Sequence, residues 1–126
     1  YVEDHCDAIG SVIDKGVIGE TYNIGGNNEI KNIDVIELIC NKMNKLLPLK
    51  NGKIYNELIT FVKDRPGHDY RYAIDASKIE GELNWKPKVT FSEGLEKTIN
   101  WYLNNRNWWM KINKIKYNQE RLGVLS

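Results

Sequence analysis

The sequence is poor in the residues that build disulfide frameworks and metal centres. Its 126 residues include 2 cysteines and 2 histidines. Cys6 and Cys40 lack C-x-x-C spacing, and each lies within an apolar helical pattern, so we expect reduced core thiols in a cytoplasmic protein. His5 and His68 are far apart in the sequence and lack companions at metal-ligand spacing, so no metal site is predicted.

Features of membrane and nucleic-acid-binding proteins are also missing. No apolar run approaches the roughly 20 residues that span a bilayer, and no signal-peptide pattern opens the chain. The formal net charge is +1, which gives no reason to expect an anionic membrane or a nucleic acid as a partner. With 41% hydrophobic residues, the chain can build one core. We therefore expect a single lobe over residues 1–126, with residues 111–126 as its C-terminal tail.

Arginine is scarce, and its distribution draws attention to one segment. The chain has 14 lysines but 4 arginines, and Arg65 and Arg71 lie within seven residues of each other. A planar guanidinium binds phosphate oxygens two at a time, which a lysine cannot do. Pro66 pushes Arg65 toward an extended conformation, and Gly67 permits a turn or a close approach to a ligand. Residues 64–69 are thus interpreted as an anion-binding loop, or alternatively as a polar turn in which Arg65 pairs with a neighbouring aspartate.

Apolar residues at helical spacing predict a helix over residues 3–14 and another that begins near Ile33. Asn32 is a plausible N-cap of the second helix, because its side chain can accept from the free backbone N–H groups of the first turn. Each helix should bury an apolar stripe. The two stripes are Ala8, Ile9, Val12 and Ile13 in the first helix, and Ile36, Ile39, Cys40, Met43, Leu46 and Leu47 in the second.

Capping signals mark helices in the second half of the chain. Residues 77–80 fit a capping box, although they could equally lie inside a helix that begins at Ala76. Asn84 can take the left-handed position at the end of that helix. Thr90 and Glu93 form a second capping box ahead of a long helix. Its predicted stripe is Leu95, Ile99, Tyr102 and Leu103, and Trp101, Trp108 and Trp109 are expected to pack in the core or at its edge.

Two short segments, residues 20–24 and 58–62, are rich in β-forming residues and are predicted to be strands. Each leads into a polar loop, residues 25–32 and 64–69. In open α/β structures, ligands bind outside the carboxyl ends of parallel strands. We therefore expect the two loops to face one cleft, with Asn32 and Arg65 opening on a shared concavity bordered by apolar residues.

Five stretches of sequence carry a resemblance to a known family. They are YVEDH at 1–5, GETYNIGGNNEIKNIDV at 19–35, ITFVKDRPGHDYRYAIDASKI at 59–79, ELNWKP at 82–87, and WYLNNRNWW at 101–109 with YNQERLG at 117–123. Through them the chain resembles the bacterial dTDP-glucose 4,6-dehydratases, which belong to the extended short-chain dehydrogenase/reductase superfamily. The first stretch and the NIGG of the second are shared by many nucleotide-sugar epimerases and dehydratases. The pattern DRPGHDxRYAIDAxKI is much narrower.

The resemblance implies an α/β fold: the small C-terminal substrate-binding lobe of such an enzyme, with short strands and several helices and without the Rossmann half. It also implies that Arg65 binds the diphosphate of a sugar nucleotide and that Asn32 contacts the same nucleotide, although Asn32 could equally be a plain helix cap. His68 is expected to shape the loop, and Asp4 and His5 to join hydrogen bonds that hold the two halves of the enzyme together. The predicted substrate-binding residues are Asn32, Asp64, Arg65, Pro66, Gly67 and His68. Tyr117 and Arg121 are considered for binding on the resemblance alone.

The catalytic and cofactor motifs of the family have no match in this sequence. There is no G-x-G-x-x-G turn, no Tyr-x-x-x-Lys pair and no Thr-Asp-Glu triplet. Because Tyr1 also falls inside a motif, we interpret the chain as the C-terminal portion of an enzyme whose missing Rossmann half binds NAD, and we assign it no catalytic residue.

The resemblance further implies a reaction and a setting. The complete enzyme, expected to be a homodimer, would oxidise C4 of dTDP-glucose by hydride transfer to NAD, eliminate water across C5 and C6, and return the hydride to C6. Its product would serve rhamnose-type deoxysugar and O-antigen biosynthesis. The alternatives are another NAD-dependent nucleotide-sugar epimerase, dehydratase or decarboxylase, and a non-catalytic nucleotide-sugar binding module.

Overall fold

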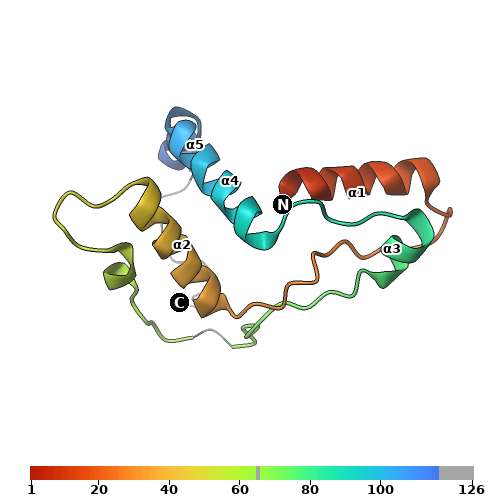
Figure 1. The fold of residues 1–126 in the computed structure, drawn as a ribbon, viewed down its shortest axis with the longest axis horizontal. Coiled ribbons are helices and arrows are strands. Elements are labelled where there is room, and N and C mark those ends of the chain that lie inside the picture. The colour runs from red at the N-terminus through yellow and green to blue at the C-terminus, as the bar shows by residue number, and fades with distance from the viewer. Residues whose placement is uncertain (65, 117–126) are drawn as a thin grey trace.

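Helices make up the regular structure of the part of the chain that the computed structural model describes, residues 1–64 and 66–116 (Figure 1). The α-helices are α1 (Val2–Lys15), α2 (Asn32–Leu46), α3 (Ser77–Leu83), α4 (Phe91–Asn104) and α5 (Arg106–Lys116), and η1 (Tyr55–Leu58) is a short 3-10 helix. Packing contacts join α1 to α3, α2 to both η1 and α4, and α4 to α5. In Figure 1 the α1–α3 pair lies toward one end and α2 toward the other, and the coil segments 16–31 and 66–76 run between them.

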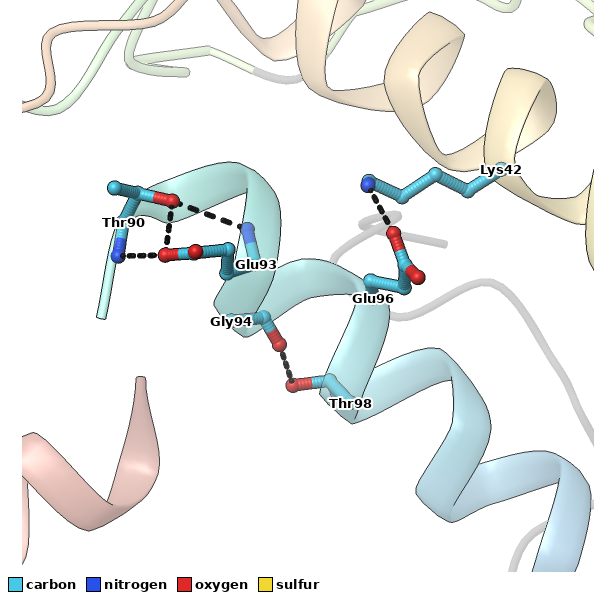
Figure 2. A network of polar contacts seen from close by, with 6 residues as sticks. All are labelled: Lys42, Thr90, Glu93, Gly94, Glu96 and Thr98. Atoms are coloured by element: carbon cyan, nitrogen blue, oxygen red, sulfur yellow. Dashed lines mark hydrogen bonds and ion pairs between the residues drawn. The ribbon is translucent and has the colours of Figure 1, made fainter.

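Two predicted capping signals, Asn84 after α3 and the box of Thr90 and Glu93 before α4, lie at helix ends as the sequence predicts. Asn84 ends α3 with φ 52° and ψ 36°, in the left-handed region. At the start of α4, the Thr90 Oγ1 accepts a hydrogen bond from the Glu93 backbone N–H at 3.3 Å, and the Glu93 Oε2 accepts from the Thr90 N–H at 3.0 Å (Figure 2). The predicted box at residues 77–80 is not formed around Ser77. Ala76 holds the N-cap position of α3 without a side-chain cap hydrogen bond, and Asp75, one residue earlier, accepts from the Ser77 N–H at 2.9 Å.

Neither predicted strand is present among the described residues. The one β-type pairing there is an isolated antiparallel bridge between Lys31 and Arg71. Residues 20–24 pack by side chains against α3, where Tyr22 donates to Glu82 at 2.9 Å and Lys78 pairs with Glu20 at 2.6 Å. A strand needs a neighbour that continues its hydrogen-bond ladder, and neither segment has one within the described ranges. The expected pair of parallel strands is therefore replaced by two coil segments.

The core is small and lies mainly between α1 and α3. Its buried residues are Ala8, Ala76, Ile79, Leu83 and Trp85, with Val12, Tyr22 and Ile24 packed against them. Asp4 is also buried, and its Oδ2 accepts from the backbone N–H of Val89 at 3.0 Å, which ties α1 to the segment before α4. Between α2 and α4, Lys42 and Glu96 form an ion pair at 2.8 Å (Figure 2).

Several residues predicted to be buried are exposed, because α1 and α2 are covered along only part of their apolar stripes. In α1, Ile13 is 78% exposed and Cys6 is exposed as well. In α2 no residue is fully buried, and Cys40 is only partly covered. The other stripe residues found exposed are Ile9, Ile36, Leu46, Leu47 and Tyr102.

The tryptophans near the end of α4 and in α5 pack at an edge and not in the core. Trp101 and Trp108 are 44% and 58% exposed, and their rings meet edge-on with centroids 5.3 Å apart. Trp109 donates its indole N–H to the Tyr102 carbonyl at 2.8 Å. Among the helices described, none is long and apolar enough to cross a membrane.

Candidate functional site

The two segments that were predicted to carry ligand loops lie against each other in antiparallel register. Gly25 is next to Ile74, and a Cβ at position 25 would come within 3.1 Å of the Ile74 Cβ, so the close approach favours glycine there. Further along, Glu29 forms an ion pair with Arg71, and the backbone of Lys31 bridges to Arg71. The paired stretch ends at Lys31, and α2 begins at the next residue. The sequence therefore brings both loops together, although not as the ends of parallel strands.

Asn32 occupies the first position of α2 and contacts the 64–69 loop. The prediction that Asn32 is the N-cap is wrong, because Lys31 holds that position and makes no side-chain cap hydrogen bond. The Asn32 Nδ2 instead donates to the backbone carbonyl of Asp69 at 2.9 Å and lies 3.4 Å from the Nε2 of His68. One turn of α2 is thereby fastened to a loop far away in the sequence.

Within the loop, Gly67 and His68 have separate structural tasks. Gly67 has φ +70°, and a Cβ there would meet no atom within 4 Å, so the glycine serves the turn and not a close approach. The His68 Nδ1 lies 2.7 Å from the Asp64 Oδ1. Arg65 lies outside the described residues, as do Tyr117 and Arg121. The shared concavity of Asn32 and Arg65 therefore stays a prediction.

A surface pocket of about 330 Å³ opens between the two segments. Its lining consists of residues 25–29 from the first segment and residues 72–74 from the second. Of the described residues, Asn32, Asp64 and residues 66–69 are not part of its lining. The volume is at the low end of small-molecule sites. The first loop thus forms a pocket whose other wall, among the described residues, is formed by residues 72–74.

The charged groups beside this pocket are paired across the two segments. Lys31 lies with its Nζ 5.5 Å from the centre of the Tyr70 ring, and hydrogen bonding to Tyr70, with Asp34 nearby, raises the pKa of the Lys31 ammonium. Arg71 is neutralised by Glu29. Arg71 is therefore engaged in holding the two segments together.

Sequence reasoning missed the residues that fasten the segments. The opposite charges of Glu29 and Arg71 can be read from the sequence, but their pairing depends on an antiparallel register that no local pattern specifies. The same holds for Asn27, whose Nδ2 donates to Glu80 in α3 at 3.0 Å. Asp4 accepts a long-range hydrogen bond from Val89 within this chain, and His5 is exposed on α1, so their predicted role between two halves of an enzyme stays a prediction. Among the described residues, no group of three or more His, Cys, Asp or Glu side chains is placed to hold a metal ion.

Comparison with known proteins places this arrangement in context. The sequence model of the family described as GDP-mannose 4,6 dehydratase matches residues 1–98. A dTDP-glucose 4,6-dehydratase of Escherichia coli is 55% identical over 127 residues, which cover 99% of this chain and 35% of that protein. The dTDP-glucose 4,6-dehydratase of Neisseria meningitidis serogroup B is 52% identical over 98% of this chain and 36% of its own length.

A solved structure is similar over most of the chain. The crystal structure of dTDP-glucose 4,6-dehydratase from Bacillus anthracis in complex with NAD superposes with a TM-score of 0.71 and is 45% identical. The match covers 88% of this chain and 32% of that protein. The chain therefore spans about a third of the length of the relatives that it matches.

Proposed function

Because the chain belongs to the GDP-mannose 4,6 dehydratase family, we propose that it is the C-terminal, sugar-nucleotide-binding portion of an NAD-dependent dTDP-glucose 4,6-dehydratase. The observation that carries the proposal is the identity of 55% to an enzyme of that name over 99% of this chain. The complete enzyme would convert dTDP-glucose to its 4-keto-6-deoxy product as a cytoplasmic homodimer. It would serve rhamnose-type deoxysugar biosynthesis, O-antigen included.

The proposed share of this chain is to hold the substrate. Arg65 would bind the nucleotide diphosphate as the bidentate cation, and Asn32, Asp64, Pro66, Gly67 and His68 would contact the same bound nucleotide or shape the loop around it. Support comes from the hydrogen bond of the Asn32 Nδ2 to the Asp69 carbonyl, which brings the start of α2 to this loop. Holding a bound sugar in register with a cofactor can lower a reaction barrier by several kcal/mol without any chemical step by the holding residues.

The residues of this chain do not fit NAD. Its sequence contains no glycine-rich G-x-G-x-x-G turn, and the coil that follows residues 20–24 enters the pocket with Gly25 and Gly26 adjacent instead of spaced. The relative in complex with NAD is about three times as long as the region matched here. We therefore assign NAD binding, hydride transfer and proton transfer to the remaining two thirds of the enzyme.

A second candidate is a dehydratase or epimerase for another nucleotide sugar. The description of the matching family, GDP-mannose 4,6 dehydratase, favours it. Such an enzyme would select a different nucleotide base, while its contacts with the diphosphate would be the same. A binding module without catalysis is the third possibility, and it predicts nucleotide-sugar binding with no product under any condition.

Reconstitution separates these possibilities. The chain is co-expressed with the N-terminal two thirds of the Escherichia coli relative, and the complex is assayed with dTDP-glucose, UDP-glucose and GDP-mannose. We expect a 4-keto-6-deoxy product from dTDP-glucose, and neither product nor micromolar NAD binding from the chain alone. Conversion of GDP-mannose in its place supports the second candidate. A stable complex that binds dTDP-glucose without turning it over would contradict the proposal and support the binding module.

A further inference from the structure

Asp64, His68 and Asn32 form a chain of contacts in which each group fixes the orientation of the next. The Asp69 carbonyl can only accept, so the hydrogen bond of 2.9 Å from Asn32 determines that the amide turns its NH₂ group toward the loop. The second hydrogen of that NH₂ group is left facing the His68 Nε2 at 3.4 Å. The contact is favourable when this nitrogen carries no proton.

The opposite side of the imidazole agrees with that assignment. A neutral imidazole without a proton on Nε2 carries one on Nδ1. The His68 Nδ1 lies 2.7 Å from the Asp64 carboxylate, which accepts a hydrogen bond from the N–H at this position. A carboxylate that accepts from one ring nitrogen of a histidine selects the tautomer and thereby the role of the other nitrogen.

We propose that Asp64 and His68 are positioning residues that hold the Asn32 amide with its Oδ1 turned to the substrate. With both Nδ2 hydrogens engaged by the loop, Asn32 offers a ligand an acceptor and no donor. It would therefore recognise an N–H or O–H group of the nucleoside or the sugar, and it would make no hydrogen bond to the diphosphate. This inference rests on the proposed function for the identity of the ligand, but the orientation of the amide can be tested without one.

Protonation of His68 should release Asn32. A proton on Nε2 would point at the Asn32 NH₂ group, so two donors would face each other and the contact would be lost. Asp64 and Asp69 flank His68 in the loop sequence, and Lys31 and Asp34 flank Asn32 at the start of α2. Asp64 contacts the imidazole directly through Nδ1, and Lys31 is engaged with Tyr70. The orientation of the Asn32 amide should then follow the protonation state of His68.

Nuclear magnetic resonance on the 126-residue chain tests the positioning directly. The ¹⁵N shifts of His68 should show a protonated Nδ1 and an unprotonated Nε2 at neutral pH. The side-chain amide of Asn32 should titrate with the same midpoint as His68 and lose this titration in His68→Phe, which keeps a ring without nitrogens. His5→Phe is the matched control in the other histidine, and the amide of Asn28, which donates to the Gly26 carbonyl at 2.6 Å, is the control resonance.

Binding measurements on the same chain test what Asn32 recognises. We expect His68→Phe to weaken binding of dTDP about three- to tenfold, to leave binding of inorganic pyrophosphate unchanged, and to add nothing to the effect of Asn32→Ala. The wild-type affinity for dTDP should fall by a similar factor as His68 is protonated. An equal loss for pyrophosphate, additive effects of the two substitutions, or an Nε2–H tautomer would each overturn the proposal. If the wild-type chain bound no dTDP, the proposed function would fail. The ¹⁵N shifts of His68 and the amide resonance of Asn32 would still show whether Asp64 and His68 orient the Asn32 amide.

Discussion

At the scale of single residues, Asp4 shows how a buried carboxylate can support a small core. Burial by itself raises the pKa of the Asp4 carboxyl, but the hydrogen bonds from the backbone of Val89 and Lys88 outweigh burial, and the pKa lies below its ordinary value. A carboxyl with a lowered pKa stabilises the fold at pH values above its unfolded pKa of about 4. That stabilisation is lost as the pH falls through the lower, folded pKa.

The Asp4→Asn variant should accordingly be less stable at pH 7 and should lose less stability on acidification than the wild type. The asparagine oxygen can still accept from Val89, but it carries no charge to lose. Urea unfolding at pH 7 and at pH 3 measures both effects. Asp7→Asn is the matched control, because Asp7 is an exposed α1 carboxylate paired with Lys88 at 2.8 Å, and such surface pairs contribute little. The same acid dependence in Asp4→Asn and the wild type would contradict this assignment.

Arg65→Lys should weaken substrate binding in the reconstituted enzyme even though it keeps the charge. Replacing a bidentate guanidinium with a single ammonium removes one charge-assisted hydrogen bond, at a cost of about 1.5–3 kcal/mol in a desolvated site. The KM for dTDP-glucose should rise roughly tenfold or more, with a smaller change in kcat. Arg71→Lys is the control, since Arg71 pairs with Glu29 and should leave the KM within about twofold. An unchanged KM in Arg65→Lys would show that residue 65 does not hold the diphosphate.

The residues that the sequence predicts correctly are those whose role is settled by their immediate neighbours. The positive φ angles of Asn84 and Gly67 depend on backbone sterics within a few residues. The local sequence is therefore enough to predict them. Asn32 was predicted to be a cap for the same local reason, and the prediction is wrong because the Asp69 carbonyl and His68 compete for its side chain. Such competition arises only when the chain folds back on itself.

At the scale of elements, the capping box of α4 should be a measurable part of helix stability. Thr90 and Glu93 satisfy each other's backbone N–H groups, and the hydrogen bonds from the Thr90 side chain and backbone lower the pKa of the Glu93 carboxyl (Figure 2). We expect Thr90→Ala to lower the free energy of unfolding by about 1 kcal/mol. Ser92→Ala, at an exposed position in the same first turn but not at the cap, should change it by less than about 0.5 kcal/mol. Equal urea midpoints for the two variants would show that the box adds nothing to stability.

Helices and strands differ in how well the sequence predicts them, for a physical reason. A helix closes its hydrogen bonds within the segment, so the apolar spacing of α1 and the capping box of α4 are enough to place these helices. A strand closes its hydrogen bonds with another segment. Residues 20–24 have the composition of a strand, yet in the described chain they are held to α3 through Tyr22 and Lys78. Composition therefore predicts where a strand could form, and the partner decides whether it does.

At the scale of the whole molecule, the surface carries more apolar side chains than its small core can cover. Phe61 is 85% exposed, Ile18 is fully exposed, and Val62 is 62% exposed. A contiguous apolar patch marks a surface where a partner binds, whereas apolar residues exposed one by one are ordinary. The relatives are about three times as long as this chain. The apolar border predicted around the concavity of Asn32 and Arg65 stays a prediction, because Arg65 lies outside the described residues.

The last prediction concerns what becomes of the segments 20–24 and 59–62 when the rest of an enzyme is present. Both have strand-forming composition and neither has a ladder partner in the described residues, so their backbone N–H groups should exchange rapidly with solvent in the isolated chain. In a complex with the N-terminal two thirds of the Escherichia coli relative, they should acquire a ladder and exchange at least about tenfold more slowly, which corresponds to ~1.4 kcal/mol. Hydrogen–deuterium exchange measures this, with α4 as a segment protected in both states.

Val62→Pro removes one ladder N–H and should reduce the gain in protection at 59–62, whereas Leu49→Pro, in the turn after α2, should not. Protection that spreads over α1 and α3 but leaves 20–24 and 59–62 unchanged would show that these segments remain coil in the complete enzyme.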